Sequence, residues 1–238
     1  MKKILAIGVL LLLVVGCGES QEKKAAKAKA AAEAEAKAVA EAKAAAEWKV
    51  IEKVIRDQIK KPAGELAEAD LVKVTSLDLH NKELTDTPQR LVKLLQLEDL
   101  VLSSNHLSDF PGNLEKIYSL SLLDLDSNQI ADMKGVGEHG SLIILFLSNN
   151  QITDLKGLEK LKRLQVLDLS SNQITDVTSL ETLYHLHELD LSNNQLSDVT
   201  GLEKLTNIKK LNLSGNPDLT KAQIDQLKKA LLFCDITR

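Results

Sequence analysis

The sequence contains few aromatic residues and only two cysteines. Aromatic residues make up 3% of its 238 residues, and its two cysteines, Cys17 and Cys234, show neither a disulfide framework nor a metal-type spacing. The net charge of −4 comes without a basic stripe, which argues against nucleic acid as a partner. No Walker loop, G-x-S-x-G or H-E-x-x-H motif occurs. We therefore expect a protein that is not an enzyme and that carries no cofactor.

The first seventeen residues have the pattern of a targeting segment. Two lysines precede an apolar run, residues 4–15, which is shorter than the ~20 residues that span a bilayer and which closes on Val-Val-Gly-Cys. This ending resembles the lipobox of bacterial lipoproteins. The resemblance implies a signal peptide over residues 1–16 and acyl chains on Cys17 that hold the protein in the bacterial envelope. Gly18 then favours the outer membrane where the cell has two membranes. The alternative is an ordinary signal peptide with an incidental cysteine.

Residues 17–47 are predicted to form the lipidated N-terminus and a helical stalk. From Glu22 to Glu47 nearly every residue is Ala, Lys or Glu, which are the strongest helix formers, and opposite charges such as Lys43 and Glu47 recur four residues apart. The stretch has too few large apolar residues to bury a core. It should be a solvated single helix, a loose coiled coil through which chains self-associate, or a partly frayed helix. It would act as a spacer.

Residues 48–73 are predicted to be an N-terminal helical cap. Trp48, Ile51, Ile55 and Ile59 fall at helical spacing on one face, which must cover the exposed end of whatever fold follows. Pro62 and Gly64 then break the helix, and a further short helical turn is expected over residues 68–72.

Residues 74–220 contain about seven copies of one repeat. The template is L-x-x-L-x-L-x-x-N-x-[IL], and its asparagine recurs every 22 or 23 residues, at Asn105, Asn128, Asn150, Asn172, Asn194 and Asn216; an earlier copy has Lys82 in this place. The pattern resembles the leucine-rich-repeat family, in particular the short 22-residue repeats of bacterial internalins. The resemblance implies an α/β solenoid, a curved right-handed superhelix with short parallel strands on its concave face.

Other positions within each repeat have predicted local roles. The asparagine should bond backbone groups at the turn after the strand. An aspartate four residues later should cap a convex helical turn, although a row of carboxylates also allows a calcium interpretation; these are Asp86, Asp109, Asp132, Asp154, Asp176 and Asp198. His185 and His187 bracket a core leucine, so packing is favoured over metal binding.

The last segment, residues 221–238, is predicted to be a C-terminal cap. Thr220 is the expected N-cap of a helix whose apolar stripe hides the last core layer. Cys234, just beyond this helix, is expected to be a packing residue rather than a nucleophile.

The candidate binding surface lies on the concave face. In each predicted strand, one outward-facing residue lies on either side of the central leucine. In the middle repeats these residues are mostly apolar with acidic neighbours, whereas in the first and last repeats they are polar. The predicted site residues are Val101, Leu122, Asp124, Ile144, Phe146, Val166 and Asp168. Strand propensity alone is the competing explanation. The predicted function is a cell-envelope lipoprotein that displays a protein-binding module on a helical spacer and binds an unknown protein or envelope ligand. The alternative is a structural envelope protein with a passive repeat head.

Overall fold

The computed structural model describes residues 21–238, which divide into two compact units between Ala45 and Ala46. The predicted signal peptide and Cys17 lie outside the described residues. Helix α1 (Gln21–Ile59) runs through this boundary. Among residues 21–238, no helix combines the length and the apolar character that a membrane span requires.

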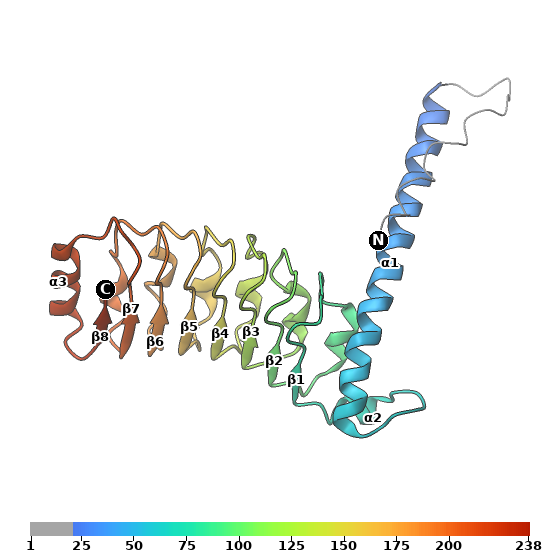
Figure 1. The fold of residues 1–238 in the computed structure, drawn as a ribbon, viewed down its shortest axis with the longest axis horizontal. Coiled ribbons are helices and arrows are strands. Elements are labelled where there is room, and N and C mark those ends of the chain that lie inside the picture. Colours follow the sequence, from blue (N-terminus) through green and yellow to red (C-terminus); the bar gives the residue numbers. More distant parts are fainter. Residues whose placement is uncertain (1–20) are drawn as a thin grey trace. The chain divides into compact units, whose positions relative to one another are not determined.

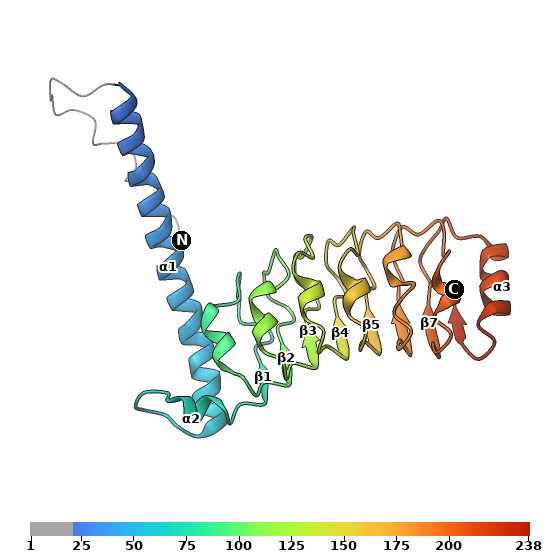
Figure 2. The ribbon, with the colours of Figure 1, turned by 180° about the vertical axis from the view of Figure 1, so that it is seen from behind.

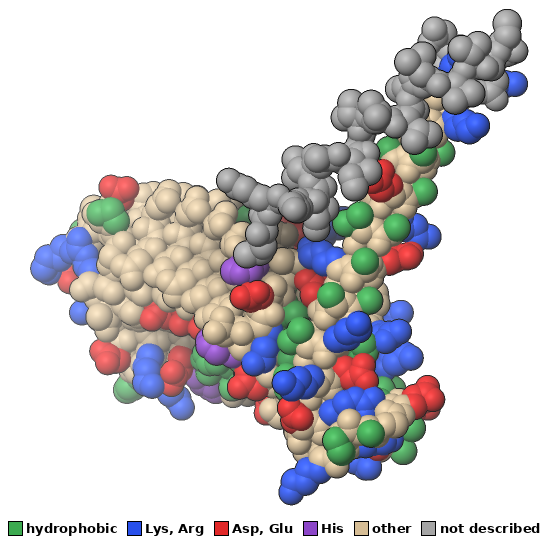
Figure 3. All heavy atoms as spheres, turned by 45° about the vertical axis from the view of Figure 1, so that its right-hand side comes forward, with side chains coloured by type: hydrophobic (Ala, Val, Ile, Leu, Met, Phe, Trp, Pro, Cys, Tyr) green, Lys and Arg blue, Asp and Glu red, His purple; other side chains and the backbone are tan. Residues whose placement is uncertain are grey.

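The first unit is a solvated stretch of α1. Every residue from Lys23 to Ala46 is exposed. Two ion pairs of the predicted kind join neighbouring turns, Lys29–Glu33 and Lys37–Glu41, each with a 3.9 Å separation between nitrogen and oxygen. Figure 3 shows acidic and basic side chains interleaved with hydrophobic ones along the helix. Such exposed pairs add only a few tenths of a kcal/mol each, so the high intrinsic helix propensity of Ala, Lys and Glu is the main local support.

The last turns of α1 belong to the second unit. Trp48, Ile51 and Ile55 are buried and join one continuous core with the leucines of the repeats. The sequence predicted that Glu47 pairs with Lys43 in a solvated stalk, and this prediction is wrong. The Glu47 carboxylate is buried and accepts hydrogen bonds from the backbone N–H and the hydroxyl of Thr85, at 3.0 and 2.6 Å. Composition alone could not reveal this, because the partner lies 38 residues away.

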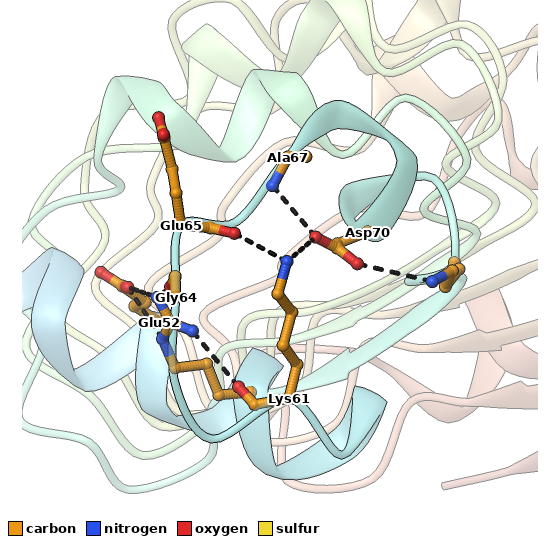
Figure 4. Close-up of polar contacts among 8 residues, drawn as sticks. Glu52, Lys61, Gly64, Glu65, Ala67 and Asp70 are labelled. Carbon is orange, nitrogen blue, oxygen red and sulfur yellow. Dashed lines mark hydrogen bonds and ion pairs between the residues drawn. The ribbon is translucent and has the colours of Figure 1, made fainter.

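A polar network fixes the turn between α1 and the repeats (Figure 4). Arg56 binds Glu52 at 2.6 Å and the Gly64 carbonyl at 2.7 Å. Lys61 contacts Asp70 at 2.5 Å, at the start of the short helix α2 (Glu68–Leu71). Hydrogen bonds from Lys61 and from the Ala67 N–H lower the pKa of Asp70 to about 2. The expected helix break and the second helical turn are both present.

Eight parallel strands form one sheet in strict chain order (Figure 1). Each strand has three residues, with a buried leucine or isoleucine at its centre. Neighbouring strands pair so that equivalent residues of successive repeats lie side by side. The strands are β1 (Ser76–Asp78), β2 (Asp99–Val101), β3 (Leu122–Asp124), β4 (Ile144–Phe146), β5 (Val166–Asp168), β6 (Glu188–Asp190), β7 (Lys210–Asn212) and β8 (Asp235–Thr237).

Short 3₁₀ turns form the opposite side of the solenoid (Figure 2). They span Gln89–Lys93, Gly112–Lys116, Val136–Glu138, Leu158–Lys160, Thr178–Leu180 and Leu202–Lys204. Two apolar side chains per repeat usually point inward here, such as Leu158 and Leu161. His139 takes the second place in one repeat. It is 3% exposed, its ring lies edge-on to Phe110, and its Nε2 has no hydrogen-bond partner among the described residues. Burial lowers the pKa of His139 to about 4.

The predicted role of the repeated asparagines is confirmed. In Asn172, the side-chain amide donates to the carbonyls of Leu169 in its own repeat and Leu147 in the preceding repeat, at 3.1 and 2.9 Å. Its oxygen accepts from the N–H of Ile152 at 3.0 Å. The other five asparagines bond the same way. Each asparagine therefore joins two repeats, and Lys82 is tolerated in the first repeat because no repeat precedes it.

Most of the aspartates do not cap the 3₁₀ turns, contrary to the sequence-based prediction. In four repeats the carboxylate accepts the backbone N–H two residues further on, as Asp154 does from Lys156 at 2.9 Å. Only for Asp176 is this N–H, that of Thr178, part of the 3₁₀ turn; in the other three repeats the turn starts later. In the repeat of Asp154 the turn begins only at Leu158, beyond the reach of so short a side chain. The aspartate stabilises the bend before the 3₁₀ turn.

The C-terminal end combines a helix with an additional strand. Helix α3 (Lys221–Ala230) begins at Thr220, whose hydroxyl accepts from the Gln223 N–H while the Gln223 side chain bonds back to the Thr220 N–H. The predicted N-cap is thus confirmed. Sequence analysis missed β8, which pairs with β7 through Asp235, Ile236 and Thr237. This strand satisfies backbone groups that would otherwise remain open at the end of the sheet.

Candidate functional site

The outward side chains of the strands form what we call the sheet face. On strands β2 to β6 the residues on either side of the buried leucine are half-buried. Strand pairing brings Leu122, Ile144 and Val166 into an uninterrupted line, which we call the apolar row. The outward residues on the other side of the buried leucines form a second line across the strands. In this second line Phe146 lies between Asp124 and Asp168 on the two neighbouring strands.

The predicted site residues are therefore brought together, but not as a single apolar patch. Val101 is separated from Phe146 by Asp124 within their line. Phe146 shares β4 with Ile144, so the ring borders the apolar row on one side and carboxylates on two others. The arrangement offers apolar contact and negative charge side by side.

Local hydrogen bonds hold the two carboxylates in place. Asp124 accepts from the Ser103 hydroxyl at 2.9 Å and from the backbone N–H of Asp126 at 3.0 Å. Asp168 accepts from the backbone N–H of Ser170 at 2.8 Å. These bonds fix the direction of each side chain before any ligand arrives, which lowers the entropic cost of binding.

A third carboxylate, Asp126, was not predicted as part of the site. It follows β3 at a place that serine occupies in neighbouring repeats, and it accepts from the Ser148 N–H at 2.6 Å. Burial raises the pKa of Asp126 to about 6, and the negative charges of Asp124 and Asp168 act in the same direction. The only sign in the sequence that Asp126 belongs to the site was an aspartate at a position where neighbouring repeats have serine.

A hollow of about 300 Å³ opens on the sheet face beside Phe146. Its lining includes Phe146, Val166 and Asp168 on β4 and β5, and Glu188, Lys210 and Asp235 on β6 to β8. The hollow thus continues the combination of apolar and acidic side chains towards the C-terminal strand.

The remaining candidates do not join this site. His185 is exposed and His187 half-buried, and residues 21–238 contain no group of three or more His, Cys, Asp or Glu side chains placed to hold a metal ion. Cys234 packs partly against the core, and burial raises the pKa of its thiol.

Family comparisons agree with this architecture. Models described as leucine-rich repeats match residues 72–130, 141–182 and 185–229, which together exceed half of the chain. The chain therefore belongs to the leucine-rich-repeat family. Domains of this family are in general protein-binding modules rather than enzymes. Among curated proteins, none matches the sequence.

Two solved bacterial structures are similar to it. Internalin C2 of Listeria monocytogenes superposes with a TM-score of 0.66 at 24% identity, over 79% of this chain and 92% of its own. A leucine-rich-repeat protein of Leptospira interrogans superposes with a TM-score of 0.58 at 28% identity, over 71% of this chain and half of its own. The likeness to internalin C2 concerns the fold.

Proposed function

We propose that this protein is a lipid-anchored protein of the bacterial cell envelope whose sheet face binds another protein. The observation that carries the proposal is the position of Phe146, an aromatic ring on a rigid strand, bordered by the apolar row and by two oriented carboxylates. Aromatic side chains next to apolar surface with a polar rim are frequent hot spots of protein interfaces. The leucine-rich-repeat family supplies the general class, protein binding.

Phe146→Ala tests this role in the full chain. The variant should lose the envelope protein that wild type captures in a pull-down, since truncating a hot spot costs ~2 kcal/mol or more of binding energy. Phe233→Ala is the matched control, because Phe233 is 95% exposed and lies outside the strands. Thermal melting should confirm that both variants fold. If Phe146→Ala captures every partner as well as wild type does, the head is passive and the protein is structural.

The anchor is proposed from sequence alone. Cys17 would carry the acyl chains, in the outer membrane where the cell has two membranes, and residues 18–45 would form the spacer. The part of α1 that lies in the first unit, residues 21–45, would extend ~38 Å at ~1.5 Å per residue. Cys17→Ser should abolish incorporation of radiolabelled fatty acid and leave an uncleaved precursor. Unchanged labelling of that variant would refute the anchor without affecting the binding proposal.

A further inference from the structure

The charge of this protein is unevenly distributed. The eight strands carry seven carboxylates, Asp78, Asp99, Asp124, Asp168, Glu188, Asp190 and Asp235, but only one basic residue, Lys210. The whole chain has a net charge of −4 and the strands one of −6, so the residues outside the strands sum to +2, which equals the charge of Lys2 and Lys3 in the predicted signal peptide. Negative charge is therefore concentrated on the sheet face, where it attracts cations selectively.

Most of this charge lacks a counterion among residues 21–238. The ion pair between Lys210 and Glu188, at 2.8 Å, is the one that involves a strand residue among residues 21–238. Asp124, Asp126 and Asp168 meet only hydrogen-bond donors there. Their mutual repulsion is visible in the raised pKa of Asp126, which has Asp124 and Asp168 among its causes after burial. A protein that retains such repulsion loses stability by it.

The geometry around Phe146 fits a long cationic side chain. An Arg or Lys side chain has an apolar stem that can lie along Ile144 and Val166, while its charged head reaches a carboxylate. The same head can face the ring of Phe146. The hollow of about 300 Å³ beside Phe146 leaves space for the charged group of this side chain. The hollow extends from β5 towards β8, and Asp168 and Asp190 are among its lining residues.

We propose that the partner of the sheet face is a protein that presents a basic segment, with an Arg or Lys side chain seated on Phe146 between Asp124 and Asp168. This inference rests on the proposed function, because it names the chemistry of the partner of the same surface. The charge complementarity selects this occupant: an acidic segment would add repulsion to a face that already has an excess of carboxylates.

Peptide binding to the full chain, purified in detergent, tests the inference. An extended peptide of about twelve residues crosses the sheet, since eight strands about 4.8 Å apart are about as wide as such a peptide is long. Three dye-labelled peptides share a Thr-X alternation in which X is Arg, Gln or Glu. The full chain should bind the Arg peptide at least about tenfold more tightly than the Gln peptide, as two or three favourable charge contacts would give. It should bind the Glu peptide most weakly.

Charge-removing variants locate the binding. Asp124→Asn with Asp168→Asn should weaken binding of the Arg peptide roughly 3- to 10-fold, because each exposed charge pair contributes a few tenths to one kcal/mol. Both changes keep the oxygen that accepts the local backbone N–H. The matched control, Asp154→Asn with Asp176→Asn, removes the same charge outside the strands and should leave binding unchanged. Raising the salt from about 0.01 M to about 1 M should also weaken binding, since the screening length falls from about 30 to about 3 Å.

The inference would be overturned by equal binding of the Arg and Gln peptides, by no binding of either peptide, or by equal effects of the two double variants. These outcomes differ from failure of the proposed function. If Phe146→Ala abolishes capture of the envelope protein but the Arg peptide has no advantage, the sheet face binds protein and our assignment of a basic partner is wrong. Self-association of the chain that the Asp124/Asp168 variant abolishes would likewise overturn the assignment of a separate partner.

Discussion

Replacing Asn172 with alanine should strongly destabilise the solenoid. The side chain is buried and makes hydrogen bonds to four backbone groups in two repeats. The Ser170 carbonyl would keep a partner, because it also accepts from the Asn149 N–H at 3.0 Å. The carbonyls of Leu147 and Leu169 would each keep one partner, the side-chain amides of Asn150 and Asn194, at 3.1 and 2.9 Å. Only the Ile152 N–H would be left inside the core without the oxygen that it bonds.

The structure gives the magnitude of this loss. An unsatisfied buried N–H costs ~1–3 kcal/mol, and the second hydrogen bonds that the carbonyls lose add to this cost, so we expect a total of about 2–4 kcal/mol. The m-value of unfolding should stay constant if the native state keeps its compactness.

Urea unfolding of residues 21–238, followed by circular dichroism, measures this effect. Asn207→Ala is the matched control, because Asn207 is exposed and its amide bonds a single carbonyl, that of Tyr184. It should cost no more than about 1 kcal/mol. Lys82→Ala should be nearly neutral, since the first repeat has no preceding repeat to join. Equal losses for Asn172→Ala and Asn207→Ala would show that the asparagine ladder does not support the fold in the way we describe.

Three further perturbations test other parts of the structure. A chain starting at residue 46 should melt like the longer protein, whereas one starting at residue 62 loses three buried apolar side chains of α1 and should melt several degrees lower; equal melting temperatures would contradict a capping role. The pKa of His139 is about 4 in the folded state against 6.5 for the free side chain, so stability should fall as pH drops from about 6.5 towards 4, and His139→Leu should flatten this dependence in pH-resolved melts. The pKa of Asp126 is raised from 3.8 to about 6, so the wild type should lose stability as pH rises through this interval. Asp126→Ser should then gain ~1–2 kcal/mol at neutral pH, after allowance for the solvent that still reaches the carboxylate, and nothing below pH ~4.

The repeats could be predicted from the sequence because their determinants are local. Leucines two residues apart define one face of a short strand, and an asparagine three residues after the second leucine can satisfy the turn that follows. The spacing of 22 or 23 residues then fixes how many such units stack. The positions of Leu122, Ile144 and Phe146 relative to the buried leucines followed directly, since side chains alternate along a strand.

Contacts between distant segments had no local signature. Glu47 looks like any other glutamate of an Ala/Lys/Glu helix, and only the fold brings it to Thr85. Strand β8 lies beyond the last copy of the repeat template and exists because β7 presents an open edge. Most of the aspartates were assigned to the wrong turn, because the sequence does not show that the 3₁₀ turn of Asp154 starts as late as Leu158.

The sequence by itself determined the repeat, its strands and which side chains face outward, because those features depend on residues a few positions apart. The tertiary structure decided which outward side chains become neighbours. Asp124 and Asp168 are 22 residues before and after Phe146, and they flank its ring only because parallel strands of successive repeats pair in register. Asp126 is likewise hard to ionise only because stacking buries it beside two other carboxylates.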